Sequence, residues 1–111
     1  MIDLLDVGRV AALNDILRRS LSGGPLVLTA GVVALGRERQ QIILDAIAAF
    51  DGFETDNDPY GEHDFGAVEA AGERIFWKID CFDRNRACAS PDPADTSVTA
   101  RVLSVMLAGE Y

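Results

Sequence analysis

The chain has 111 residues and a formal net charge of -8, from 18 acidic and 10 basic side chains. A chain of this length can bury one hydrophobic core but not two, so we expect a single domain over residues 1–111. Because 49% of the residues are hydrophobic, the composition disfavours intrinsic disorder. The excess of acids disfavours direct binding to nucleic acid phosphates and to anionic membranes.

Residues 3–20 predict an amphipathic helix. Acidic residues near its start, and Arg18 and Arg19 near its end, have charges that favour the helix dipole. Residues 22–25, Ser-Gly-Gly-Pro, predict its end, because glycine and proline disfavour helix continuation. The apolar residues at helical spacing are Leu4, Leu5, Val10, Leu13, Ile16, Leu17 and Leu21.

The apolar run at residues 26–30 predicts a short strand. The longer run over residues 26–35 falls short of the roughly 20 residues that a membrane helix needs. The N-terminus also lacks the basic region of a secretory signal, so we expect a cytoplasmic protein. A second helix is predicted from Arg37 to about Phe50, with an apolar face formed by Ile42, Ile43, Ala46, Ile47 and Phe50.

Residues 65–69 and 74–80 predict a β-hairpin with a turn at Ala71 and Gly72. Trp77 shares the apolar face of its strand, so we expect it to be buried. A third helix is predicted after a loop over residues 83–95. Its buried face would comprise Val98, Val102, Leu103, Met106 and Leu107.

These elements predict an α+β fold with the order α-β-α-β-β-α. Its small antiparallel sheet, a hairpin plus one strand, would be covered by helices. Cys81 and Cys88 lack metal-motif spacing, so two free thiols are expected in a reducing compartment.

Residues 56–66 read Asp-Asn-Asp-Pro-Tyr-Gly-Glu-His-Asp-Phe-Gly, with four acids and no lysine or arginine. The stretch begins like a calcium loop, but Tyr60 and Ala67 occupy positions where that loop has ligands. Glu62, His63 and Asp64 could contribute to a transition-metal site only with distant partners such as Asp80 or Asp83. These matches are incomplete, so no metal and no cofactor is predicted.

His63 beside Asp64 could also form an acid/base pair, which leaves a small hydrolase-like enzyme as an alternative. The spacing of a nuclease, a phosphate-binding loop or a nucleophile elbow is absent from the sequence, so no catalytic residue is assigned. A structural interpretation needs only Asx-type turns at Asn57 and Asp58, with Pro59 and Gly61 shaping the loop.

The strings NDPYGEHDFG, FWKID and SPDPAD, together with ALNDILR and GGPLVLTAGVVAL, resemble a bacterial family known as domain-of-unknown-function family 3768. The resemblance covers nearly the whole chain and implies no activity and no catalytic residues. It implies small proteins carried as accessory cargo of plasmids and other mobile elements.

The acidic balance and this resemblance favour a non-catalytic binding protein that occupies a basic, nucleic-acid-handling site on a partner. A defence complex such as a CRISPR effector is the partner we expect, and the protein would then be an anti-CRISPR or other anti-defence inhibitor that mimics nucleic acid. The sequence makes no prediction of oligomeric state. The predicted partner-binding residues are Asp56, Asp58, Tyr60, Glu62, His63 and Asp64.

Overall fold

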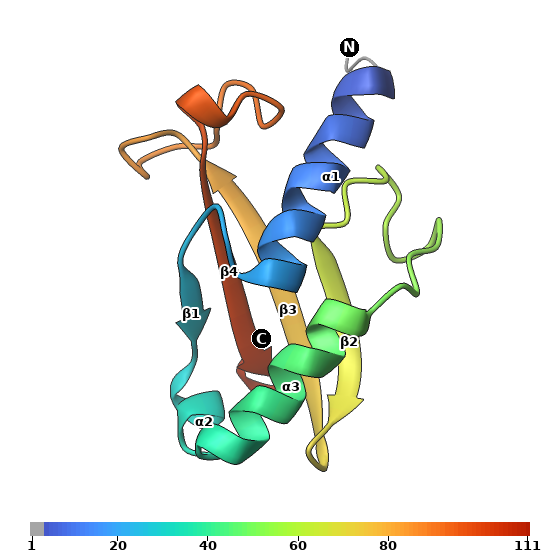
Figure 1. The fold of residues 1–111 in the computed structure, drawn as a ribbon, viewed down its shortest axis with the longest axis vertical. Coiled ribbons are helices and arrows are strands. Elements are labelled where there is room, and N and C mark those ends of the chain that lie inside the picture. Colours follow the sequence, from blue (N-terminus) through green and yellow to red (C-terminus); the bar gives the residue numbers. More distant parts are fainter. Residues whose placement is uncertain (1–3) are drawn as a thin grey trace.

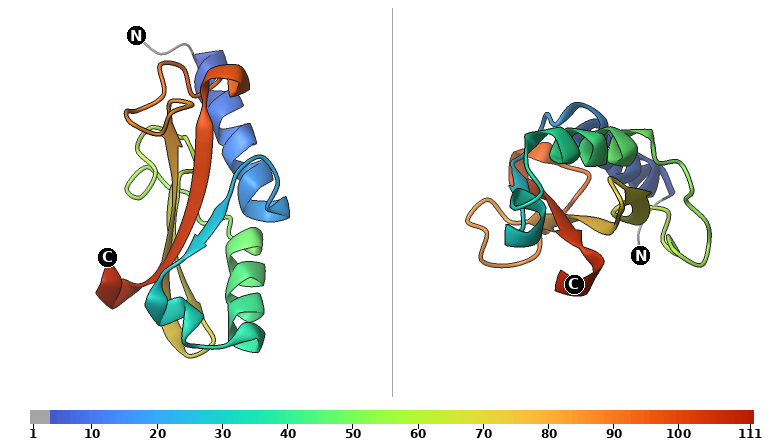
Figure 2. Two further views of the ribbon diagram at one scale, coloured as in Figure 1. Left: turned by 90° about the vertical axis from the view of Figure 1, so that its left-hand side faces the viewer. Right: turned by 90° about the horizontal axis from the view of Figure 1, so that it is seen from below.

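The computed structural model describes residues 4–111, with side chains from Asp6 onwards. Helices lie on one face of a four-stranded sheet (Figures 1 and 2), which is the predicted α+β class. The elements along the chain are α1 (Leu4–Ser20), β1 (Leu26–Leu28), α2 (Ala30–Val33), α3 (Arg37–Ala49), β2 (Phe65–Ala70), β3 (Glu73–Phe82) and β4 (Ala100–Leu107), with short 3-10 turns at Thr96–Val98 and Ala108–Glu110.

The two long helices, the first strand and the hairpin are confirmed. Asp3, the predicted start of the first helix, lies outside the described residues. The one-turn helix α2 was not predicted, because four residues are too few to show a period.

The predicted third helix is wrong: residues 100–107 form strand β4. Its run Val-Leu-Ser-Val-Met-Leu places apolar residues at both helical and strand spacing, so periodicity alone does not separate the two. β4 lies between β1 and β3, and both of its faces are buried. A central strand of this kind has a nearly continuous apolar sequence instead of alternation. Asp95, at the end of the predicted loop, accepts the N–H of Ser97 in a 3-10 turn.

The sheet has the order β1-β4-β3-β2 and is mixed instead of antiparallel. β2, β3 and β4 pair antiparallel, but β1 pairs parallel to β4, with Leu26 opposite Leu103. The prediction of an antiparallel sheet failed because it treated the partner of β1 as a helix.

Trp77 is fully buried, as predicted, in the core between the sheet and the helices. The predicted helix faces are partly wrong, because Ile16 is 52% and Ile42 47% exposed. On α1 the inner face instead includes the polar Asn14 and Arg18, which are 0% and 1% exposed. A count of apolar residues cannot find this face, since these two positions are polar.

Cys81 is half-buried and Cys88 is exposed, and both are free thiols, as predicted. Burial raises the pKa of the Cys81 thiol, which disfavours its reactive thiolate form. No described helix combines the length and apolarity needed to cross a membrane.

Candidate functional site

The predicted site lies in the long connection between α3 and β2, which runs beside α1 (Figure 1). Its first half is folded by local hydrogen bonds. The N–H of Glu54 donates to Asn57 Oδ1 at 2.8 Å, and Asn57 Nδ2 donates to the carbonyl of Gly52 at 2.9 Å. The N–H of Asp58 closes the turn by donating to the carbonyl of Glu54 at 2.7 Å. These hydrogen bonds therefore hold this half of the loop in a defined conformation, which its turn-forming residue types favour.

Asp58, one of the predicted partner-binding residues, is only 8% exposed. Its Oδ1 accepts the N–H of Glu62 at 3.1 Å and the N–H of His63 at 3.2 Å. These bonds satisfy the backbone where the chain bends sharply, with Gly61 at φ 69° and His63 at φ 55°. The Asp58 carboxylate thus holds the loop together from within.

His63 lies between the carboxylates of Asp15 and Asp58. Its Nδ1 is 3.1 Å from both Asp15 oxygens, and its Nε2 is 3.8 Å from Asp58 Oδ2. Its ring stacks on Phe53, with centroids 3.9 Å apart and planes 2° from parallel. Asp15 belongs to α1, so this contact ties the loop to the helix across 48 residues of sequence.

Arg18 anchors the other end of the loop, and its role was missed from the sequence. Its guanidinium donates to the carbonyls of Ile47, Ala48 and Phe50 at 2.8, 3.1 and 2.8 Å, at the end of α3. A cation there also favours the helix dipole. The group lies 5.3 Å from the Phe53 ring centroid and 5.5 Å from that of Trp77, which are cation–π distances.

Arg18 also forms an ion pair with Asp15, at 2.8 Å. Partial burial of Asp15 opposes its ionisation, but hydrogen bonds from Arg18 and His63 outweigh burial and lower the pKa of the carboxyl below its usual value. An ionised Asp15 therefore joins the helix α1 to both ends of the loop. The sequence carries one signal for this cluster, because Arg18 is a charged residue among apolar residues that recur at helical spacing.

The remaining predicted residues differ in exposure. Asp56 is exposed, and Tyr60 is 77% exposed. Glu62 and Asp64 are half-buried, and burial is the main cause that raises the pKa of each, with a further contribution from neighbouring carboxylates. The structure therefore separates an outer part of the loop, Asp56 and Tyr60, from an inner part, Asp58 and His63.

Within residues 4–111, no three His, Cys, Asp or Glu side chains form a group that could hold a metal ion. Phe53, Thr55, Tyr60 and His63 line part of an open depression of about 490 Å³ in the loop.

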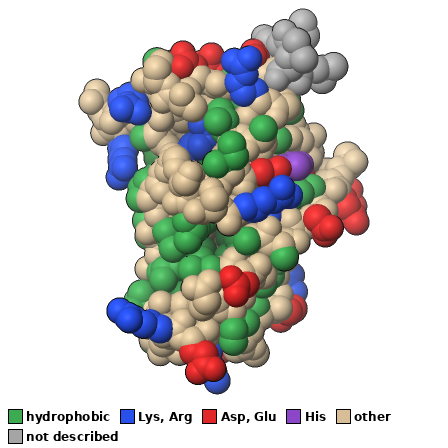
Figure 3. Space-filling model, in the orientation of Figure 1, with side chains coloured by type: hydrophobic (Ala, Val, Ile, Leu, Met, Phe, Trp, Pro, Cys, Tyr) green, Lys and Arg blue, Asp and Glu red, His purple; other side chains and the backbone are tan. Residues whose placement is uncertain are grey.

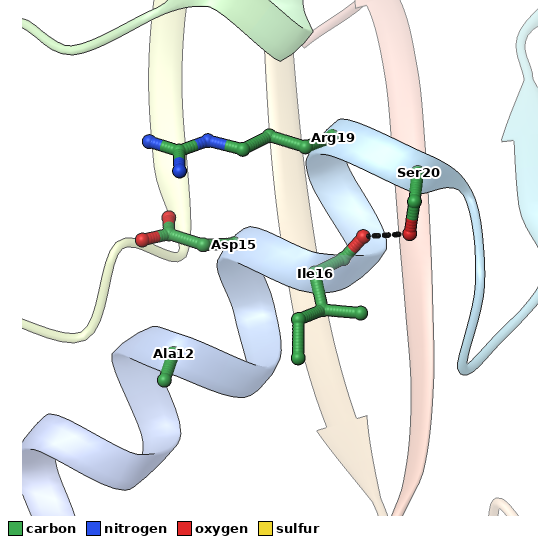
Figure 4. A pocket seen from close by; sticks show the side chains of 5 residues that line it. All are labelled: Ala12, Asp15, Ile16, Arg19 and Ser20. Carbon is green, nitrogen blue, oxygen red and sulfur yellow. Dashed lines mark hydrogen bonds between the residues drawn. The ribbon is translucent and has the colours of Figure 1, made fainter.

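A neighbouring depression of about 410 Å³ lies along the outer side of α1. Asp15 and Arg19 extend from the helix in the same direction, with Ile16 and Ser20 on the next side of the turn (Figure 4). Figure 3 shows the histidine beside acidic and basic side chains on this face. Because Asp15 also contacts His63, it links the α1 depression to the loop.

No curated protein and no solved structure matches the chain. A family described as "Protein of unknown function (DUF3768)" matches residues 28–110, which include α3, the loop and the complete hairpin. Because this match covers more than half of the sequence, the chain belongs to the DUF3768 family.

Proposed function

We propose that the protein is a non-catalytic binding module whose outer loop docks on a basic protein surface. Tyr60 is the aromatic anchor, and the exposed acids Asp51, Glu54 and Asp56 of the same loop supply the negative charge. Tyrosine is enriched among the residues that dominate interface energies, because it combines a large apolar ring with a polar end. The observation that carries the proposal is the 77% exposure of Tyr60 on this acidic loop.

The surrounding charge supports a basic partner. No lysine or arginine occurs between Arg39 and Arg74, so the loop has no base of its own to neutralise its acids. Complementary charge accelerates association and makes its rate sensitive to salt. The inner contacts of Asp58 and His63 hold the loop in one shape, which reduces the entropy lost on binding.

More specifically, we propose that the partner is a nucleic-acid-handling protein, such as a CRISPR effector. The acids would occupy lysines and arginines that otherwise contact phosphates. This form is supported by the net charge of -8 and by the mobile-element context that the family resemblance implies.

The test uses two triple variants with the same change in charge. Asp51→Asn, Glu54→Gln and Asp56→Asn alter the loop, whereas Glu38→Gln, Asp45→Asn and Glu69→Gln alter exposed acids elsewhere. Surface-immobilised proteins are presented with a panel of purified bacterial nucleic-acid-handling effectors over a series of salt concentrations. We expect the loop variant to associate more slowly and with a weaker salt dependence, while the control variant keeps the parent rate.

Tyr60→Ala is measured in the same assay and should weaken affinity by roughly tenfold or more if the ring is an anchor. Equal binding by the parent, the loop variant and Tyr60→Ala would contradict the proposal.

The second candidate function is hydrolysis, favoured by one observation. A carboxylate holds the Nδ1 side of His63, as in sites where an acid orients a catalytic imidazole, and Thr55 lines the same depression. Turnover of ester or phosphodiester substrates by the parent, lost in both His63→Gln and Asp15→Asn variants that remain folded, would support this function over the binding module.

A further inference from the structure

Arg84, Arg86 and Arg101 line one pocket of about 300 Å³ on this acidic protein. The pocket lies between the α1–β1 connection and the loop that follows β3. In Figure 3 the basic side chains at the upper left gather over that loop. Three of the chain's ten basic residues thus converge on one small pocket. Among the described residues, none of the three forms an ion pair.

Arg101 is the fixed element of the pocket, because it is only 4% exposed. Its Nε donates to Asn14 Oδ1 at 2.8 Å, and one terminal nitrogen donates to the carbonyl of Pro93. The amide of Asn14 is itself oriented by a 2.9 Å bond to the carbonyl of Glu62. The hydrogen-bond partners of Arg101 are therefore neutral, and no described carboxylate forms an ion pair with its buried guanidinium group. A buried charge without a counter-charge is costly, and an anion in the pocket would offset that cost.

Arg84 and Arg86 are presented by a folded turn. The N–H of Asp83 donates to the carbonyl of Cys88 at 2.8 Å, and that of Arg86 donates to the carbonyl of Asp83 at 2.9 Å. The carboxylate of Asp83 is engaged as an acceptor for the N–H of Ala87, at 2.9 Å. Arg86 has φ 57°, in the left-handed region that L-residues other than asparagine and aspartate rarely adopt. The turn thus places the two arginines at the rim of the pocket.

The other wall consists of Gly23 and Gly24. A Cβ on Gly24 would lie 2.1 Å from the carbonyl oxygen of Arg101, so only glycine allows the loop to approach β4 this closely. No described residue accepts a hydrogen bond from the N–H of either glycine. Successive backbone N–H groups are suitable donors to anions, and here the two glycines line the same pocket as the three arginines.

We propose that this pocket binds the phosphate group of a small phosphorylated ligand. Guanidinium groups match phosphate oxygens with paired, charge-assisted hydrogen bonds, and backbone N–H groups beside glycine add neutral donors. The pocket volume suits a ligand of mononucleotide size. This site is separate from Tyr60 and the acidic loop, so the docking proposal and the phosphate proposal can fail independently.

The test compares two double variants that each remove two exposed arginines. Arg84→Gln with Arg86→Gln changes the pocket, and Arg37→Gln with Arg39→Gln makes the same charge change on α3. Titrations with inorganic phosphate and with a nucleoside monophosphate are followed by amide NMR shifts and calorimetry at constant ionic strength. We expect saturable shifts at Gly23, Gly24 and Arg101 in the parent. The pocket variant should lose roughly tenfold or more in affinity, and the control variant should match the parent.

Tighter binding of the nucleoside monophosphate would identify an organic phosphate as the ligand, whereas equal binding of inorganic phosphate would identify the free ion. Either result supports a phosphate site. Three outcomes would overturn it: no saturable shift in the parent, equal affinity of the two double variants, or citrate binding as tightly as phosphate. Tighter binding of duplex DNA than of the mononucleotide, lost in the pocket variant, would also overturn the assignment to a small ligand.

Discussion

Buried polar side chains account for much of how this protein holds its loop. Asp58 satisfies backbone N–H groups at a sharp bend, and Arg18 satisfies carbonyls at the end of α3. Both are charged groups whose burial would be unfavourable without these partners. Some acids of the stretch therefore stabilise the loop, and only the others form its exposed surface.

Replacing Asp58 tests this supporting role. Asp58→Ala should lower the free energy of unfolding by about 2 to 3 kcal/mol, because it removes a charged acceptor from two N–H groups. Asp58→Asn keeps one acceptor oxygen and should cost less. Urea unfolding would measure both, with exposed Asp56→Ala as the control that stays near the parent. Equal unfolding midpoints for Asp58→Ala and Asp56→Ala would show that the Asp58 bonds contribute little.

At this scale the sequence could predict the turn but not which acids it buries. Proline, glycine and Asx residues indicate local geometry from neighbours along the chain. The burial of His63 depends on Asp15, which lies on α1 and far away in sequence. The separation of outer Asp56 and Tyr60 from inner Asp58 and His63 therefore follows from tertiary contacts.

Among the elements, β2 and β3 show how closely the sheet packs. Gly66 pairs with Trp77, and a Cβ on Gly66 would lie 2.6 Å from the Trp77 Nε1 atom. Trp77 is fully buried and cannot move into solvent to make room. The glycine in this strand is thus required by a side chain on its neighbour.

Gly66→Ala should therefore destabilise the protein by about 1 to 3 kcal/mol through overpacking. Gly8→Ala is a matched control, since a Cβ there meets nothing within 4 Å and the residue lies in helix α1. That change should stabilise by up to about 1 kcal/mol, because alanine favours helix over glycine. Thermal or urea unfolding would compare them, and a stabilising Gly66→Ala would mean that the indole lies elsewhere.

The elements that the sequence predicts correctly are those whose pattern reflects one buried face. α3 and the strand of Trp77 each have such a face, at periods of 3.6 and 2 residues. β4 is buried on both sides and has no contrast between faces. Its misassignment as a helix follows from its central place in the sheet, which the sequence does not show.

Over the whole molecule, folding shifts the pKa values of different acids in opposite directions. Hydrogen bonds from Thr29, and from the N–H groups of Leu107 and Gly31, lower the pKa of Glu110, while the contacts described above lower that of Asp15. Burial raises the pKa of Glu62 and Asp64. When the pH is below the ordinary carboxyl pKa of about 4, the unfolded chain binds protons that the ionised Asp15 and Glu110 of the folded protein do not bind. In this range the stability therefore rises with pH.

Above that range the folded protein keeps protons on Glu62 and Asp64 that the unfolded chain has lost, so their contribution to stability falls as pH rises through the raised pKa values. We expect Asp64→Asn to remove part of this fall, so that its stability relative to the parent improves from pH 4 towards neutrality. Urea unfolding across roughly pH 3 to 8 would measure it. Asp56→Asn serves as the control on the same loop, and a difference between Asp64→Asn and the parent that does not change with pH would contradict the expectation.

The parallel pairing of β1 with β4 also has a consequence for synthesis. Leu26 finds its partner Leu103 only after all of the intervening chain has left the ribosome. Such non-local pairing folds slowly, because the chain entropy lost in closing the loop comes before the contacts that offset it. Until β4 emerges, α1 and β1 lack the central strand against which they pack, whereas α3 packs against β2 and α1. The nascent chain therefore completes its core late, when β4 joins β1 to the hairpin of β2 and β3.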